Sequence, residues 1–89
     1  MYIIDCSKMT TRKDAFEELK RGLEAPDYMG ANLDALHDVL GETRGEVRLV
    51  HVCKMLNALK GYGCNMLKVF FDAAEENEAL TVLLGHGQE

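Results

Sequence analysis

The chain has few of the residues that build disulfide-rich or metal-binding scaffolds. Its 89 residues include three cysteines, one proline and no tryptophan. Cys6, Cys53 and Cys64 are odd in number, widely spaced and without a CxxC pair, which argues against both a disulfide framework and a zinc site. We therefore expect reduced thiols in a cytoplasmic protein, with no metal and no cofactor.

Long apolar segments are also absent. No window approaches the ~20 apolar residues of a membrane-spanning helix, so we expect no membrane association. The opening MYIIDCSKM lacks the basic region and apolar core of a signal peptide. A chain of 89 residues supports a single domain, which we place at residues 1–89 with a polar tail from about residue 85.

Basic residues are missing from one segment. Residues 24–43, EAPDYMGANLDALHDVLGET, contain five acids and no lysine or arginine. The chain has 15 acids and 10 bases in all, so the remainder is balanced at ten of each and the net charge of −5 lies in this segment. Such a surface suits a cationic partner. It argues against direct nucleic-acid binding, which needs clustered Lys and Arg.

The hydrophobic pattern predicts strands separated by pairs of helices. Short apolar runs predict strands at 2–4, 47–52 and 80–84. Helical spacing predicts helices at about 11–23, 33–40, 53–60 and 66–76. The order β-α-α-β-α-α-β implies parallel pairing through right-handed crossovers. All the strands look apolar on both faces, so we predict an α/β fold, a small three-stranded parallel sheet covered by about four helices.

Particular residues are assigned to caps, turns and core. Thr10 or Thr11 is expected to cap the first helix and Asn32 the second. Gly61-Tyr62-Gly63 is expected to end the third helix, and His51 to lie within the second strand. The residues expected to be buried are the three cysteines, Leu33, Leu36 and Leu40 of the second helix, and Leu67, Phe70, Phe71 and Ala74 of the fourth.

The second helix carries a column of like charges. Asp34, Asp38 and Glu42 are spaced i, i+4, i+8, which costs about 0.2–0.5 kcal/mol per neighbouring pair. Asp34 lies in the first turn, where a carboxylate complements the helix N-terminus, so a structural role explains it equally well. Asp38 lies in the last turn, where an anion is disfavoured. A solvated surface charge is one explanation of Asp38, but a cationic partner accounts for it better.

Two other residues beside this helix are candidates. Tyr28 precedes it and is either an interface anchor or a staple that packs back onto the helix. His37 is adjacent to the acidic column, and with no second His or Cys at ligand spacing it does not indicate a metal. Catalysis is disfavoured, because a short exposed helix offers no desolvated cleft for paired carboxylates. We therefore expect no enzymatic activity, and a small thiol or carboxylate enzyme is the least favoured alternative.

Two segments, APDYMGANLDALHDVLGE and VFFDAAEENEALTVLL, resemble the barstar family of intracellular barnase inhibitors. The run Pro-acid-Tyr-x-Gly-x-Asn-Leu-Asp-Ala-Leu-x-Asp is the more specific part, and the similarity extends through nearly the whole chain. The resemblance implies a barstar-like fold that is monomeric when free. It also implies a 1:1 complex with a small basic extracellular-type ribonuclease, whose active site an acidic helix blocks by mimicking RNA phosphates.

The resemblance assigns roles to individual positions. Asp38 matches the dominant acidic contact, which takes the place of a substrate phosphate, and Asp34 matches a second acidic contact. Tyr28 matches a tyrosine that packs against the enzyme. Asp72 falls where the family has a glutamate. The partner-binding residues it implies are Tyr28, Gly30, Asn32, Asp34, His37, Asp38, Asp72 and Glu76.

Three further positions depart from the family pattern. Met29 stands in place of a second tyrosine, His37 in place of a tryptophan, and Arg44 adds a positive charge in a turn that lacks a tryptophan. These changes leave the acidic residues intact and alter their apolar surroundings. The alternative function is a non-inhibitory acidic module that binds another basic protein.

Overall fold

The strands form one parallel sheet with helices packed against it. The computed structural model describes residues 1–26 and 29–85. Strands β1 (Tyr2–Asp5), β2 (Gly45–Val50) and β3 (Leu80–Leu84) are adjacent in the order β1-β2-β3, and both pairings are parallel. Ile4 pairs with Leu49, and Leu49 with Leu84. The three-stranded parallel sheet is therefore confirmed.

Within the described residues, four α-helices connect the strands in the predicted order. They are α1 (Arg12–Leu23), α2 (Leu33–Glu42), α3 (Val52–Leu59) and α4 (Gly61–Glu76), with a short 3-10 helix, η1 (Cys6–Lys8), after β1. Thr11 caps α1, since its hydroxyl oxygen accepts a hydrogen bond from the N–H of Asp14 at 3.1 Å. The expected polar tail falls mainly at 86–89, outside the described residues.

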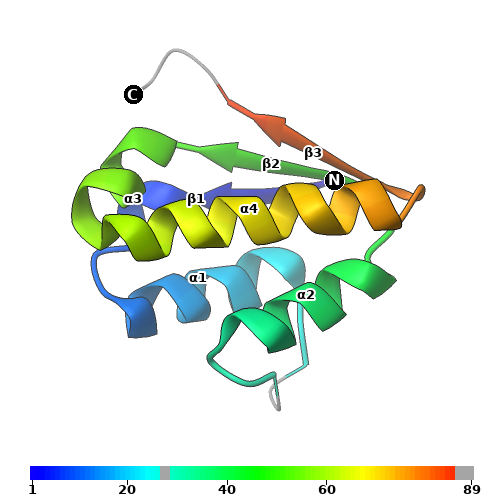
Figure 1. Cartoon of the computed structure of the whole chain (residues 1–89), viewed down its shortest axis with the longest axis horizontal. Helices are drawn as coiled ribbons and strands as arrows, with labels where there is room; N and C mark the ends of the chain where they lie inside the picture. The colour runs from blue at the N-terminus through cyan, green and yellow to red at the C-terminus, as the bar shows by residue number, and fades with distance from the viewer. Residues whose placement is uncertain (27–28, 86–89) are drawn as a thin grey trace.

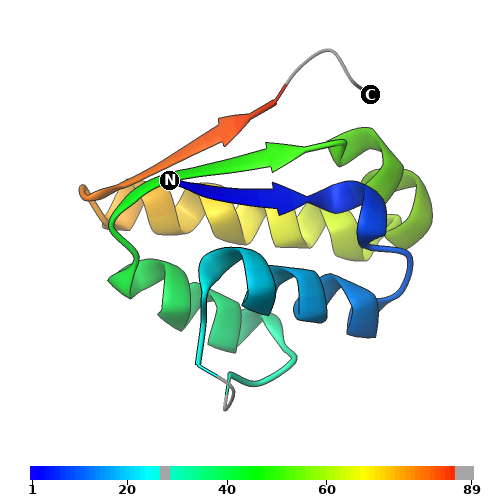
Figure 2. The ribbon, with the colours of Figure 1, turned by 180° about the vertical axis from the view of Figure 1, so that it is seen from behind.

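The helices pack against one face of the sheet only (Figures 1 and 2). Ile4, Val47 and Leu49 point to the helices and are buried, whereas Ile3 is 50% exposed and Arg48 is exposed on the other face. The expectation that all the strands are apolar on both faces is wrong for β2, because Arg48 is exposed on the uncovered face. One face is uncovered because the strands are sequential in the sheet, and successive right-handed crossovers in one direction place all their helices on the same side.

The third and fourth helices meet more tightly than predicted. Gly61-Tyr62-Gly63 does not end a helix but forms the first turn of α4, and Lys60 alone, at φ 55° and ψ −130°, joins α3 to α4. Gly63 is buried, and a Cβ there would lie 3.4 Å from the Leu56 side chain. That distance is ordinary van der Waals contact, so the close junction of α3 and α4 reflects the single-residue turn at Lys60.

The second strand begins and ends two residues earlier than the predicted range 47–52. β2 ends at Val50, and His51 adopts a left-handed conformation with φ 58°. Val52 then begins α3, so His51 is the turn between strand and helix rather than a strand residue. Apolar residues flank His51 on both sides, Leu49 and Val50 before it and Val52 after it. The hydrophobic pattern therefore does not indicate where the strand ends.

The buried face of α4 is rotated from the predicted one. Phe70 is buried as predicted, and Leu67 and Ala74 pack half-buried against the core. Met66 and Ala73 are also buried, whereas Phe71 is 43% exposed. Cys6 is buried as expected, but Cys53 and Cys64 are exposed, so the expectation that they lie in the core is wrong. Small apolar residues near helix ends fit exposed and buried sites equally well, and only the packing direction of α3 and α4 decides between them.

A buried acid joins α1 to the end of β1. The Glu18 side chain is only 4% exposed. Its Oε1 accepts a hydrogen bond from Arg21 Nε at 2.8 Å, and its Oε2 accepts one from the N–H of Asp5 at 2.8 Å. Arg21 Nη2 also donates to the Ile3 carbonyl at 3.3 Å. The Arg21 hydrogen bond, and secondarily the Asp5 N–H, lower the pKa of Glu18 despite its burial.

Glu18→Gln should lower the free energy of unfolding by about 1–2 kcal/mol near neutral pH, since it removes a charge-assisted hydrogen bond. Because the folded pKa lies below the ordinary value of 4.5, the wild-type contribution is complete above about pH 4.5 and disappears as pH falls through the lowered pKa. Urea unfolding as a function of pH measures this. Glu17→Gln, at an exposed neighbour, is the control, and parallel pH curves for Glu18→Gln and wild type would contradict the assignment.

Asn77 ties the end of α4 to the end of α2. Its Nδ2 donates to the carbonyl of Leu40 at 3.0 Å and to that of Thr43 at 2.8 Å. Its Oδ1 accepts a hydrogen bond from the N–H of Ala79 at 3.1 Å. The carbonyls at the end of a helix have no intrahelical partner. One amide side chain therefore fixes the carboxyl end of α2 against the segment that leads into β3.

Asn77→Asp should destabilise the protein by about 1–3 kcal/mol, because a carboxylate keeps the acceptor for Ala79 but offers no donor to the α2 carbonyls. The change should concentrate at the last turn of α2, where amide hydrogen exchange should accelerate. Asn65→Asp, at an exposed position of α4, is the matched control. Equal exchange rates in the two variants would show that the Asn77 hydrogen bonds do not hold α2.

Candidate functional site

Helix α2 is anchored along one side and exposed along the other. Leu36 and Leu40 are both 0% exposed, which confirms their predicted place in the core, and Leu33 is half-buried. Asn32 caps the helix, since its Oδ1 accepts a hydrogen bond from the N–H of Ala35 at 2.8 Å. The cap and the leucines fix the rotation of α2 about its axis.

The acidic column lies on the exposed side. Asp34, Asp38 and Glu42 are all exposed. Within residues 1–26 and 29–85, none of their carboxylates forms an ion pair or a hydrogen bond. The last turn of α2 contains no basic residue. The column is therefore a negatively charged surface without a described counter-ion.

Helix α4 brings further acids to the side of α2. The two helices pack together, and His37 Nε2 lies 3.6 Å from Glu76 Oε1. Asp72 is half-buried one turn before Glu76, so the two acids share a face of α4. The structure thus brings His37 of α2 next to Glu76, although the two are far apart in the sequence.

In the segment before α2, the backbone passes close to the residues that cap the helix. A Cβ on Gly30 would lie 3.1 Å from Asn32 Nδ2 and 3.6 Å from Ala35 Cβ, so the backbone passes close to the cap. Met29 is 9% exposed and belongs to the core rather than to the exposed surface. Tyr28, predicted to contact a partner, lies outside the described residues.

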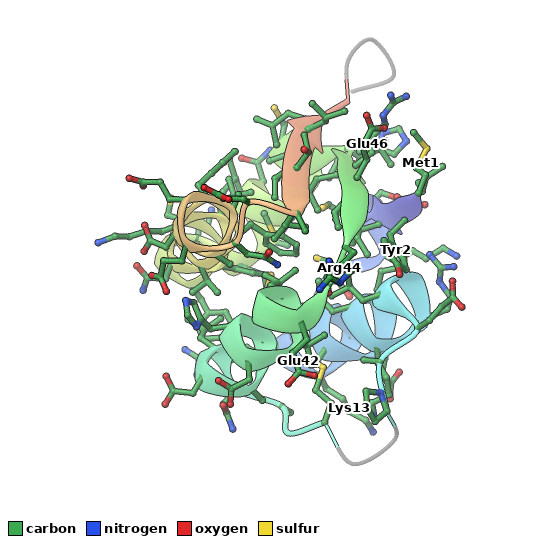
Figure 3. The ribbon with its side chains drawn as sticks, turned by 90° about the vertical axis from the view of Figure 1, so that its right-hand side faces the viewer. Met1, Tyr2, Lys13, Glu42, Arg44 and Glu46 are labelled. Carbon is green, nitrogen blue, oxygen red and sulfur yellow. The ribbon has the colours of Figure 1, made fainter. Side chains whose placement is uncertain are left out.

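A cleft of about 610 Å³ opens beside the acidic column. It lies between α2, the end of α1 and the beginnings of β1 and β2, with Leu23, Met29 and Val39 among its apolar lining residues. Asp38 and Glu42 line it from α2, and Arg44 from the turn before β2. Figure 3 shows Tyr2, Glu42 and Arg44 on this side of the molecule.

Two parts of this site were missed by sequence analysis. The cleft forms between segments distant in the sequence, so no local pattern could have indicated it. Asn77 was missed because its function depends on two carbonyls more than 30 residues away. The i+8 spacing marked Glu42 as part of the acidic column, but nothing in the sequence indicated that Glu42 lines the cleft. Among the described residues, no group of His, Cys, Asp and Glu is placed to hold a metal ion.

Of the helices in the described part of the chain, none is both long and apolar enough to cross a bilayer. No curated protein matches the chain. A family model described as Barstar (barnase inhibitor) matches residues 1–85, which is nearly the whole chain. That family is defined by inhibition of a ribonuclease rather than by an enzymatic activity. The chain, with its parallel sheet and four helices, belongs to the barstar family.

Proposed function

We propose that this protein is a cytoplasmic inhibitor of a small basic barnase-type ribonuclease and that α2 blocks the active site of the enzyme. The observation that carries the proposal is the exposed column of Asp34, Asp38 and Glu42, which has no described counter-ion. Membership of a ribonuclease-inhibitor family supports it.

The mechanism is charge mimicry. A ribonuclease binds the phosphates of RNA with lysine, arginine and histidine side chains, and carboxylates on a rigid helix can occupy the same positions. Asp38 is the central contact and Asp34 the second, on the same exposed side of α2. Long-range attraction should raise the association rate by ~10–10³ over a neutral pair, and salt should weaken it.

Helix α4 extends the contact surface. Glu76 lies next to His37 of α2, so an enzyme seated on α2 would also meet the end of α4. Asp72, half-buried one turn earlier, adds a second carboxylate to that side. Asn77 is a positioning residue, because its hydrogen bonds hold the ends of α2 and α4 together and so fix the spacing of the two acidic groups.

Asp38→Ala should weaken inhibition by on the order of 2–5 kcal/mol, because it leaves desolvated cations of the enzyme unpaired; that range includes charge pairs of the barnase–barstar complex itself. Titration of RNA cleavage by a small basic barnase-type ribonuclease measures it. Glu46→Ala, which removes an equal charge from an exposed position of the sheet, is the control. Stoichiometric inhibition by wild type with less than tenfold weakening in Asp38→Ala would contradict the role of Asp38.

A further inference from the structure

We propose that the cleft beside Asp38 is a second contact site, which receives an arginine side chain carried on a basic loop of the partner protein. The inference rests on the proposed function, since it takes the partner to be a basic protein seated on α2. It adds a site that the acidic column alone does not require.

The walls of the cleft suit an aliphatic chain. Its lining residues include Leu23 of α1, Met29 from the segment before α2, and Val39 of α2. Leu23 and Met29 are also part of the hydrophobic core. Arginine and lysine side chains bury their methylene stems on such surfaces while the charged group stays at the polar edge. A wholly polar ligand would gain nothing from these walls.

The charges of the cleft select a cation. Glu24, Asp38 and Glu42 line it, against the single base Arg44. In the described parts of the chain, Arg44 forms no ion pair with these acids. Phosphates, sulfates and fatty acids would meet three carboxylates, which excludes anionic ligands. A guanidinium fits better than an ammonium, because it binds carboxylates through two parallel hydrogen bonds and is more weakly hydrated.

The position of the cleft makes it continuous with the proposed inhibitory face. Asp38 belongs both to the exposed column of α2 and to the lining of the cleft. A protein that places a cation on Asp38 therefore brings its neighbouring loop to the cleft entrance. The volume of about 610 Å³ lies within the range of ligand sites. It leaves room for the residues that flank the arginine.

Arg44 occupies the same surface as the incoming arginine. It lines the cleft together with Glu42, and Figure 3 shows it beside Tyr2 at the start of the sheet, above Glu42. Its charge opposes a second cation. Removal of Arg44 should therefore strengthen the binding of a cationic side chain. A purely structural role for Arg44 would not produce this increase in affinity.

The direct test is a titration of the free protein with N-acetyl-L-arginine methylamide at millimolar concentrations, followed by NMR of the methyl groups of Leu23, Met29 and Val39. We expect saturable shifts of these methyls, at least twofold weaker binding in Glu42→Gln and tighter binding in Arg44→Ala. The uncharged analogue N-acetyl-L-norleucine methylamide should bind more weakly. Absent or non-saturable shifts, or equal binding of the norleucine analogue, would overturn the proposal.

Two variants test whether the cleft contributes to inhibition of a small basic barnase-type ribonuclease. Val39→Phe fills the cleft without a change of charge, and Glu42→Gln removes one of its carboxylates; each should weaken inhibition at least threefold. Glu46→Gln is the charge-matched control, since Figure 3 shows Glu46 beside Met1 on the sheet whereas Glu42 ends α2. Thermal unfolding checks that Val39→Phe folds.

The outcomes separate this inference from the proposed function. If the wild-type protein inhibits and both cleft variants inhibit equally well, the cleft proposal is wrong and the inhibitory role of α2 stands. If the wild-type protein does not inhibit, the proposed function fails. The arginine titration still decides whether the cleft binds a guanidinium, because it involves no nuclease.

Discussion

Helix α2 depends on contacts with the rest of the molecule, because its own charges oppose its formation. The column of Asp34, Asp38 and Glu42 contains two like-charge pairs that cost about 0.2–0.5 kcal/mol each. Burial of Leu36 and Leu40, both 0% exposed, contributes about 1.5–3 kcal/mol for each leucine and outweighs that cost. With Asn32 at one end and Asn77 at the other, the fold can hold an acidic surface rigid without neutralising it.

The sequential order of the strands determines where that surface lies. Because β1, β2 and β3 are neighbours in chain order, their right-handed crossovers place the helices on one face of the sheet. Helix α2 packs against α4, and the side of α2 that carries the acidic column stays exposed. The same arrangement brings Glu76 to His37 and opens a cleft between α2, the end of α1 and the first residues of the strands.

Local patterns in the sequence predicted the element order, the caps at Thr11 and Asn32 and the exposed acids of α2, because each depends on residues within a few positions. The predictions that failed depend on how elements meet. The left-handed turn at His51 and the start of α4 at Gly61 follow from tight junctions that apolar runs conceal. The exposure of Phe71 and the Asn77 hydrogen bonds follow from the packing of α4, which no local pattern specifies.

The central claim is that the acidic face of α2 occupies the phosphate-binding site of a ribonuclease. The most direct measurement is equilibrium competition between this protein and a non-cleavable oligonucleotide for a small basic barnase-type ribonuclease. Our account predicts that the apparent Kd of the protein complex rises in proportion to the oligonucleotide concentration, because both ligands need the same site. A ternary complex with an unchanged Kd would contradict the account, and would favour an acidic module that binds a basic protein without blocking its active site.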